Sequence, residues 1–357
     1  MMKILIVVFC MVALTACGGS SSGSQDPAGG NDSASDSDEW LIPGSEVLDG
    51  GPGKDGIPAI SDPSYLAASE ARYLDDSNLV VGVNLDGEIR AYPHRILDWH
   101  EIVNEQFGDT PYSLNYCPLT GSAMLWEGRH EASDPTYGVS GLLFNSNLIL
   151  YDRETDSYWS QMLAESVRGP RAGEEARRLA VVETTWGNWR TMYPDSLVMD
   201  TQTGFSRDYT RYPYGSFRTD NNLIFPVSDR DERLHLKTRV LGVRIDEFSK
   251  VYPVERFTDQ VEVINEVNNG YVVVGSSGRN FAMAFNAVLD DGTQLTFEAV
   301  ADGGPVVMED QEGTRWDIFG RAVSGMREGE QLEPMFSYIA YWFAWAAFFP
   351  GAEVYEP

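Results

Sequence analysis

The side chains best suited to chemistry in this chain are one cysteine and one histidine. The sequence holds three cysteines and four histidines. Cys10 and Cys17 fall in an N-terminal segment that we predict to be removed or modified, so Cys117 is the one thiol expected to remain free. His100 precedes it by seventeen residues. We therefore predict a candidate site around Cys117 and His100.

Thiol catalysis is the first chemistry that these residues suit. Cys117 would be the nucleophile and His100 its general base, with Glu101 or Asp152 orienting the imidazole. Arg153 follows Asp152 directly and would bind an anionic group of the substrate. These five residues are the predicted catalytic set, although a Cys and a His seventeen residues apart form no known signature.

Metal binding is the second possibility, because thiolate and imidazole ligands suit copper or zinc. Cys117 and His100 would be the ligands, with Glu101, His94 or Met124 completing the site. The chain has neither a C-x-x-C nor an H-E-x-x-H motif. A third possibility is a non-catalytic ligand-binding or structural module of the cell envelope, so whether the protein is an enzyme stays open.

The N-terminus predicts export and a lipid anchor. Residues 4–14 form an apolar run of about eleven residues, which suits a signal peptide and is too short to span a membrane as a helix. Leu14-Thr15-Ala16-Cys17 resembles a bacterial lipobox, so we expect a signal peptide over 1–17 and lipidation of Cys17. Residues 18–39 are rich in Gly, Ser and Asp and predict a flexible tether. Gly18 after the lipidated Cys favours the outer membrane, facing the periplasm.

The charge balance excludes one class of partner. Asp and Glu number 54 against 26 Lys and Arg, a net charge of -28 over 357 residues. A surface this acidic repels phosphate backbones, so we expect no nucleic-acid partner. The expected partners are the membrane, through the lipid on Cys17, and an unidentified small molecule or metal.

The remainder of the chain contains an internal repeat that must position the site. Residues 80–93 match residues 240–253 with identical internal spacing, and further blocks recur in the same order. We predict two tandem pseudo-repeats of about 120 residues packed about a pseudo-twofold axis. The expected fold class is α+β and β-rich. The predicted segments are a lead-in over 40–78, repeat 1 over 79–200, a Tyr/Arg-rich connector over 201–239 and repeat 2 over 240–357.

Local patterns predict the elements of one repeat. A hairpin is expected over 79–92, and Pro93 should begin a short helix. A second helix is expected over 185–192 with Thr185 as its N-cap. Its counterpart, residues 338–349, is almost wholly apolar and predicts a buried helix.

The difference between the repeats supports the site prediction. Repeat 1 reads Trp99-His100-Glu101 where repeat 2 reads Gln260-Val261-Glu262. The block around Cys117 has no Cys counterpart in residues 275–279. A scaffold needs neither residue, so their presence in one repeat alone points to function.

Several of these blocks resemble one known family. They are Asp55-Gly56-Ile57-Pro58-Ala59, Trp99-His100-Glu101-Ile102-Val103-Asn104, Tyr116-Cys117-Pro118-Leu119-Thr120-Gly121-Ser122, Tyr151-Asp152-Arg153-Glu154-Thr155 and Trp159-Ser160-Gln161. The chain is similar, from about residue 54 to its end, to the bacterial and archaeal family called domain of unknown function 3179. The resemblance implies no particular activity. Some members carry a second Cys where this chain has Thr120, so a dithiol is not expected here.

Overall fold

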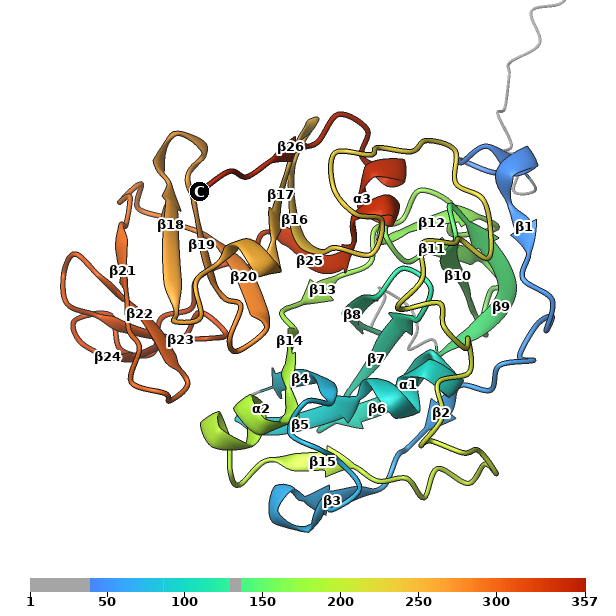
Figure 1. Cartoon of the computed structure of the whole chain (residues 1–357), viewed down its shortest axis with the longest axis horizontal. Coiled ribbons are helices and arrows are strands. Elements are labelled where there is room, and N and C mark those ends of the chain that lie inside the picture. The colour runs from blue at the N-terminus through green and yellow to red at the C-terminus, as the bar shows by residue number, and fades with distance from the viewer. Residues whose placement is uncertain (1–38, 86, 129–135) are drawn as a thin grey trace, which may run out of the picture. The chain divides into compact units, whose positions relative to one another are not determined.

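Six β-sheets contain most of the regular secondary structure of the described residues (Figure 1). The computed structural model describes residues 39–85, 87–128 and 136–357. The predicted signal peptide, its lipidation point Cys17 and residues 18–38 lie outside the described residues. Within the described part of the chain, no helix is both long enough and apolar enough to cross a bilayer.

The first three sheets are built from the N-terminal half of the described chain. Blade 1 has the order β14 (Val182–Thr185), β4 (Leu79–Leu85), β5 (Glu88–Pro93), β15 (Leu197–Met199), β3 (Tyr65–Ala67). Blade 2 has the order β13 (Arg178–Leu179), β8 (Ser122–Glu127), β7 (Thr110–Cys117), β6 (Ile102–Phe107), β2 (Ile60–Ser61). Blade 3 has the order β1 (Leu48–Asp49), β9 (Tyr137–Phe144), β10 (Asn147–Asp152), β11 (Tyr158–Ser160), β12 (Glu165–Arg168).

The other three sheets follow in the C-terminal half. Blade 4 has the order β25 (Phe336–Tyr341), β16 (Arg239–Ile245), β17 (Phe248–Pro253), β26 (Glu353–Val354). Blade 5 has the order β18 (Glu262–Glu266), β19 (Tyr271–Ser276), β20 (Phe281–Asn286). Blade 6 has the order β21 (Phe297–Ala299), β22 (Val306–Asp310), β23 (Arg315–Asp317), β24 (Ala322–Ser324).

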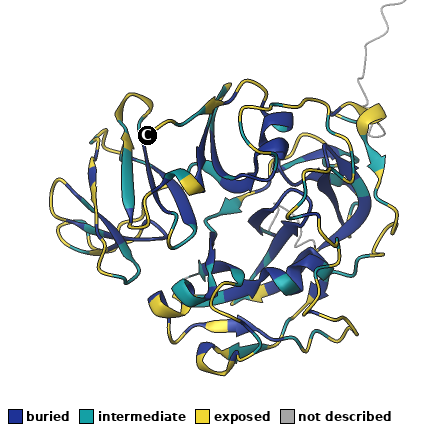
Figure 2. Cartoon of the chain, viewed as in Figure 1, coloured by how far each residue is buried: buried dark blue, intermediate teal, exposed yellow. Residues whose placement is uncertain are grey.

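In the described part of the chain, helices are short and few. The α-helices are α1 (His94–His100), α2 (Trp186–Met192) and α3 (Trp342–Phe348), and the 3-10 turns are η1 (Gly44–Glu46), η2 (Ala68–Glu70), η3 (Val254–Arg256) and η4 (Val267–Asn269). The prediction for α2 is confirmed, since the Thr185 hydroxyl accepts from the Asn188 N–H at its start. The 338–349 segment is a buried helix only from Trp342 onward, because residues 336–341 form β25 (Figure 2).

The predicted fold class is wrong in its architecture. The six sheets form a six-bladed β-propeller, 41% strand and 11% helix, and not an α+β fold of two tandem repeats about a pseudo-twofold axis. The β-rich character is confirmed. The physical reason is that both faces of a blade are apolar: Val80 and Val81 are adjacent in β4, and both are fully buried, in different hydrophobic clusters. A sheet that is apolar on both faces must pack against a neighbour on each side.

The core therefore lies between blades. One cluster joins blades 1 and 2, a second joins blades 2, 3 and 4, a third joins blades 4 and 5, and a fourth joins blades 5, 6 and 1. These contacts run once around the ring and return to the first blade. The described residues accordingly form one compact unit.

Candidate functional site

Helix α1 supplies the chemically active side chains of the site. Pro93 precedes it, and the Glu101 N–H closes its last turn by donating to the Leu97 carbonyl oxygen at 2.8 Å. His94, Asp98 and Glu101 are spaced by four and three residues, which puts them on one face of the helix. His100 is on a different face.

His100 is held by partners on that other face. Its Nδ1 lies 2.8 Å from the Pro58 carbonyl oxygen and its Nε2 lies 2.6 Å from the Tyr209 hydroxyl. Burial lowers the pKa of His100, so the ring is neutral at pH 7. In that state Nδ1–H donates to Pro58 and Nε2 accepts from Tyr209. Both ring nitrogens are thus used in fixing the lead-in segment and the connector to α1.

Cys117 ends β7 and has other neighbours. Its side chain is 1% exposed, and its Sγ lies 3.8 Å from the Ser146 carbonyl oxygen. Burial, and then the nearby carboxyl of Glu101, raise the pKa of the Cys117 thiol to about 11. The structure therefore brings Glu101 to Cys117 and gives His100 separate partners.

Asp152 and Arg153 are held in structural contacts. The Asp152 carboxylate accepts from the Thr155 N–H at 2.6 Å and from the Trp159 indole at 3.1 Å, which closes the turn between β10 and β11. In blade 6, Asp310 accepts from the Trp316 indole in the same way, at 3.0 Å. Arg153 donates to Asp55 at 2.9 Å.

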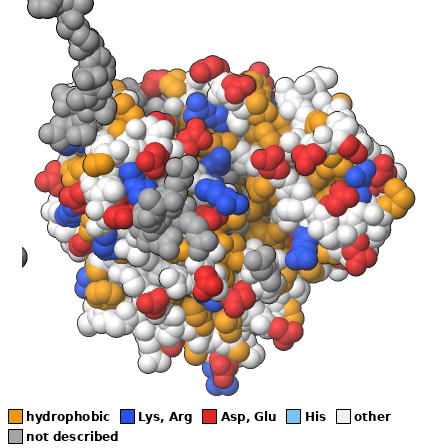
Figure 3. Space-filling model, turned by 180° about the vertical axis from the view of Figure 1, so that it is seen from behind, with side chains coloured by type: hydrophobic (Ala, Val, Ile, Leu, Met, Phe, Trp, Pro, Cys, Tyr) orange, Lys and Arg blue, Asp and Glu red, His pale blue; other side chains and the backbone are white. Residues whose placement is uncertain are grey.

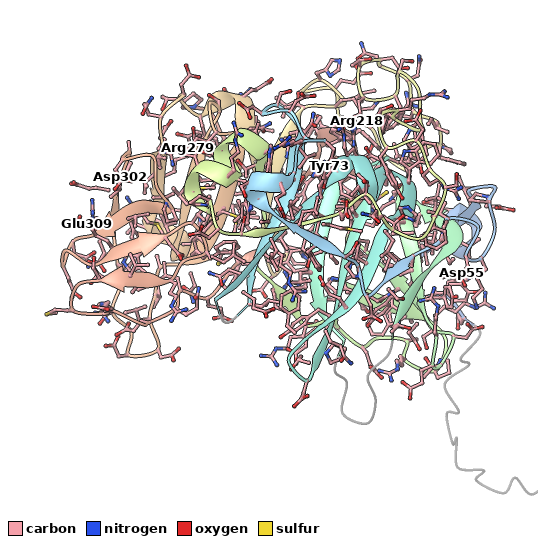
Figure 4. All side chains as sticks on the ribbon, turned by 90° about the horizontal axis from the view of Figure 1, so that it is seen from below. Asp55, Tyr73, Arg218, Arg279, Asp302 and Glu309 are labelled. Carbon is pink, nitrogen blue, oxygen red and sulfur yellow. The ribbon has the colours of Figure 1, made fainter. Side chains whose placement is uncertain are left out.

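Arg153 also donates to the Tyr137 carbonyl oxygen at 2.6 Å, so its guanidinium is tied to blade 3. Figure 4 shows its partner Asp55 well separated from Arg218, a residue of the connector. The structure thus places Asp152 and Arg153 apart from the α1 face.

The predicted metal ligands do not converge. The described residues contain no group of three or more His, Cys, Asp or Glu side chains that could hold a metal ion. His94 contacts Glu183, and Met124 lines a cavity near the centre of the propeller. Among these residues the copper or zinc site built on Cys117 and His100 has no third ligand.

A buried polar network supports the turn that follows Cys117. The Thr120 and Ser122 hydroxyls are 2.8 Å apart, and Ser122 donates to the Gln161 side-chain oxygen at 2.7 Å. The Asn147 amide donates to Thr120 at 2.9 Å and to Gln161 at 2.7 Å. These four side chains satisfy one another, which is the requirement for burying polar groups without loss of stability.

The α1 face meets the connector at an ion pair. Arg218 contacts Asp98 at 2.5 Å and donates to the Tyr116 hydroxyl at 3.0 Å (Arg218 is labelled in Figure 4). Asp98 is 4% exposed. Burial raises the pKa of Asp98 to about 7, although Arg218 acts in the opposite direction. Asp98 can therefore gain or lose a proton near neutral pH.

His94 continues this cluster toward the centre of the propeller. Its ring packs against Tyr116 with 4.6 Å between the ring centroids. Its Nε2 lies 3.1 Å from a Glu183 carboxylate oxygen, which in turn lies 3.3 Å from Arg239. Burial lowers the pKa of His94, so the imidazole is neutral at pH 7.

Glu101 completes the face. It accepts from the Tyr214 hydroxyl at 3.0 Å, and burial raises its pKa to about 7, helped by the charge of Asp98. Its backbone has φ 59° and ψ −33°, a region that residues other than glycine rarely adopt. Such strain, of order 1–3 kcal/mol, tends to gather at functional sites.

A pocket opens over this face. It has a volume of about 330 Å³ and includes Asn78 and Tyr209 in its wall. Its charged and aromatic lining is His94, Arg95, Asp98, Arg211, Tyr212 and Arg218. Three arginines thus surround one carboxyl and one neutral imidazole.

Sequence reasoning selected His100 and Glu101 at the end of α1, whereas the pocket is lined by His94 and Asp98 of the same helix. The signal that was missed is the spacing of His94, Asp98 and Glu101, which only a helix places together. The connector carried a second signal, because residues 201–239 hold seven of the 26 Lys and Arg residues. The contacts of Arg218 and Tyr214 with α1 join positions more than a hundred residues apart, which spacing alone does not show.

The comparisons with known proteins give one result. A family model described as "Protein of unknown function (DUF3179)" matches residues 54–352. No curated protein and no solved structure matches the chain.

Proposed function

Because the chain belongs to the DUF3179 family, whose description names no activity, we propose a function from the site alone. The pocket over α1 binds a small molecule that carries an anionic group, and Asp98 exchanges a proton with it. This moves the candidate site from the Cys117–His100 pair to the face formed by His94, Asp98 and Arg218.

The observation that carries the proposal is the charge of the pocket. The chain has a net charge of -28, yet Arg95, Arg211 and Arg218 line one 330 Å³ pocket. The single carboxylate in the lining is Asp98, which pairs with Arg218. A cleft with a local excess of positive charge attracts anions, and guanidinium groups bind carboxylate or phosphate oxygens with two parallel hydrogen bonds.

The acid–base role rests on the state of Asp98. A general acid or base is most effective when its pKa lies near the working pH, and the pKa of Asp98 is raised to about 7 by burial. His94, also in the lining, is neutral there and can accept a hydrogen bond from the ligand. The Cys117 thiol fits catalysis less well, because its pKa of about 11 leaves it protonated.

We also propose that the protein is exported and held at the outer membrane by lipid on Cys17, facing the periplasm. The apolar run over 4–14, the block Leu14-Thr15-Ala16-Cys17 and the Gly/Ser/Asp-rich tether support this. Metabolic labelling of expressing cells with a radioactive fatty acid tests it, and a C17S variant that still incorporates label would contradict it.

Calorimetric titration with sulfate tests the binding role, since the charge of sulfate is constant between pH 5 and pH 9. Arg211 is exposed at the rim of the pocket, so R211Q should weaken sulfate binding about tenfold. Arg207 belongs to the same connector, stacks over Trp99 and is absent from the lining, so R207Q is the matched control. Equal effects of the two variants, or no sulfate binding, would refute the proposal.

The pH dependence of the same titration tests the proton. Ionised Asp98 repels an anion, so sulfate affinity should fall as the pH rises through about 7. In D98N the side chain stays neutral, and the change in affinity between pH 6 and pH 8 should be much smaller, since only Glu101, outside the pocket lining, still titrates in this range. A wild-type affinity that is flat over this range would show that Asp98 does not titrate in the pocket.

A further inference from the structure

A second, separate cavity lies where four blades meet. It has a volume of about 200 Å³, and its walls come from β8, β13, β14, β20 and β25 together with the residues before β25. Strands β8 and β14 contact blades 4 and 5 through β25 and β20. These labels lie together near the centre of Figure 1. The cavity is therefore at the axis of the propeller, and we call it the axial cavity.

The axial cavity contains an arginine that no carboxylate contacts at ion-pair distance. Arg178 of β13 lines this cavity and also a neighbouring pocket that holds Glu175, and its guanidinium lies 4.0 Å from the centroid of the Phe336 ring. Among the described residues, no Asp or Glu oxygen lies within ion-pair distance of Arg178. Burial lowers the pKa of Arg178, while the charge of Glu175, which lies beyond ion-pair distance, acts in the opposite direction. A partly desolvated cation that no carboxylate contacts favours an anionic partner.

The other charges of the cavity are already balanced or lie at its edge. Glu183 is 3.1 Å from His94 and 3.3 Å from Arg239, so its carboxylate is paired. Glu333 is exposed to solvent. Within the axial cavity, the charge that remains for a ligand is therefore that of Arg178.

Methionine and alanine side chains form the adaptable, apolar part of the wall. Met124, Met283 and Met335 come from three separate segments, and all three line the cavity. Ala123, Ala282 and Ala284 leave the space between them. Methionine side chains rearrange readily around apolar ligands of different shape. Figure 3 also shows hydrophobic side chains gathered in a depression near the middle of the rear surface.

We propose that the axial cavity is a binding site for a short aliphatic carboxylate, whose carboxylate pairs with Arg178 and whose chain lies against Met124 and Met283. The volume of about 200 Å³ exceeds the roughly 150 Å³ of an apolar cavity that holds benzene, which suits an aliphatic chain of several carbons. This site has its own lining, distinct from that of the pocket over α1, and the proposal does not rest on the function proposed there.

Calorimetric titration of the full chain with octanoate tests the proposal. We expect octanoate to bind the wild-type protein and R178Q to weaken this binding at least tenfold. R178K, which keeps the positive charge, should retain most of the octanoate affinity. Arg177 is the matched control, because it is the preceding residue, is 74% exposed and pairs with Glu127 at 2.9 Å. R177Q should bind octanoate within twofold of wild type. Octanol, which has the same chain and no charge, should bind at least tenfold more weakly.

A measurement on the unmodified protein keeps the test decisive if R178Q fails to fold. In protein labelled with ¹³C at the methionine methyls, octanoate should shift the resonance of Met283 and leave that of Met326, which is 81% exposed, unchanged. The proposal is overturned if Met283 does not respond, or if R178Q and R177Q bind octanoate equally. Sulfate titration of the same samples reports on the α1 pocket separately, so the failure of one site is distinguishable from failure of the other.

Discussion

Glu101 shows how burial, more than residue type, decides what a side chain can do here. It is 5% exposed and has a strained backbone. Its carboxyl accepts a hydrogen bond from the Tyr214 hydroxyl, and the charge of Asp98 raises its pKa. Its pKa of about 7 makes it a proton donor at acidic pH and a buried anion at alkaline pH. An anion buried beside another acidic group lowers the stability of the fold.

We therefore expect stability to fall as the pH rises through the range set by Glu101. The folded protein holds the Glu101 proton up to about pH 7, whereas the unfolded chain loses it near pH 4.5. Ionisation of Glu101 should therefore lower the free energy of unfolding by roughly 2–3 kcal/mol between pH 4.5 and pH 7. E101Q mimics the protonated form and should remove that part of the loss in urea titrations at pH 5 and pH 8. E70Q, at an exposed position, should leave the wild-type pH dependence intact, and an identical slope in E101Q would contradict the assignment.

Cys117 provides a second test at this scale. Because the thiol is 1% exposed and its pKa is about 11, it should resist iodoacetamide at pH 7.5 and react once urea unfolds the chain. A C10S/C17S variant leaves Cys117 as the sole thiol, so mass spectrometry can follow it directly. Rapid labelling of the folded protein would show an activated cysteine and restore the thiol hypothesis.

The residues that sequence analysis selected were chosen by chemical type, and this explains its partial success. Cys117, His100 and Glu101 do lie at the junction of α1 and β7, and Glu101 belongs to the α1 face. The role of His100 depends on Tyr209, which follows it by more than a hundred residues and belongs to the connector. Such a contact leaves no trace in local spacing.

At the scale of the elements, close packing of tryptophan on glycine holds the hairpins of blades 1 and 4. A Cβ atom at Gly82 would lie 1.9 Å from the Trp189 ring, and one at Gly242 would lie 2.3 Å from the Trp345 ring. Glycine is required at both positions because α2 and α3 press their tryptophans onto β4 and β16. These pairs match in sequence as well as in structure.

G82A should therefore destabilise the protein by at least 1–3 kcal/mol, the usual cost of overpacking. The measurement is the midpoint of urea unfolding. G304A is the matched control, because a Cβ atom there would meet its nearest neighbour, an Asp302 oxygen, at an ordinary 3.4 Å. A G82A midpoint equal to that of G304A would show that Trp189 can move aside.

Comparison of the two repeats in the sequence predicted individual elements, because matching residues occupy matching structural positions. Asn104 bonds both backbone groups of Tyr137, and Asn265 bonds both backbone groups of Phe297, at matching positions in the chain. Matching residues make matching local contacts, so hairpins and α2 could be predicted. The number of strands in a sheet could not, because strands such as β14 and β15 join sheets begun about a hundred residues earlier.

At the scale of the whole molecule, closure of the ring makes every blade depend on its neighbours. The hydrophobic cluster that joins blades 5, 6 and 1 contains residues from both ends of the described chain, such as Ala68 and Leu332. Removing one blade would expose the apolar faces of two others. Cooperative unfolding is the expected consequence.

We predict a single unfolding transition for the propeller. Tryptophan fluorescence and far-UV circular dichroism should give the same urea midpoint, and G82A in blade 1 and G242A in blade 4 should each shift the entire curve. Two resolved transitions, each sensitive to one of the two variants, would instead support separately folding halves.

The contact between His94 and Glu183 has a consequence for how the two cavities communicate. One residue faces the pocket over α1, the other faces the axial cavity, and 3.1 Å separates their polar atoms. His94 and Glu183 thus form part of the wall between the two cavities. A charged ligand bound in one cavity would change the electrostatic potential in the other. Thermodynamic linkage makes this effect reciprocal: if a ligand in one cavity changes the affinity of the other cavity for its ligand, the second ligand changes the affinity for the first by the same factor.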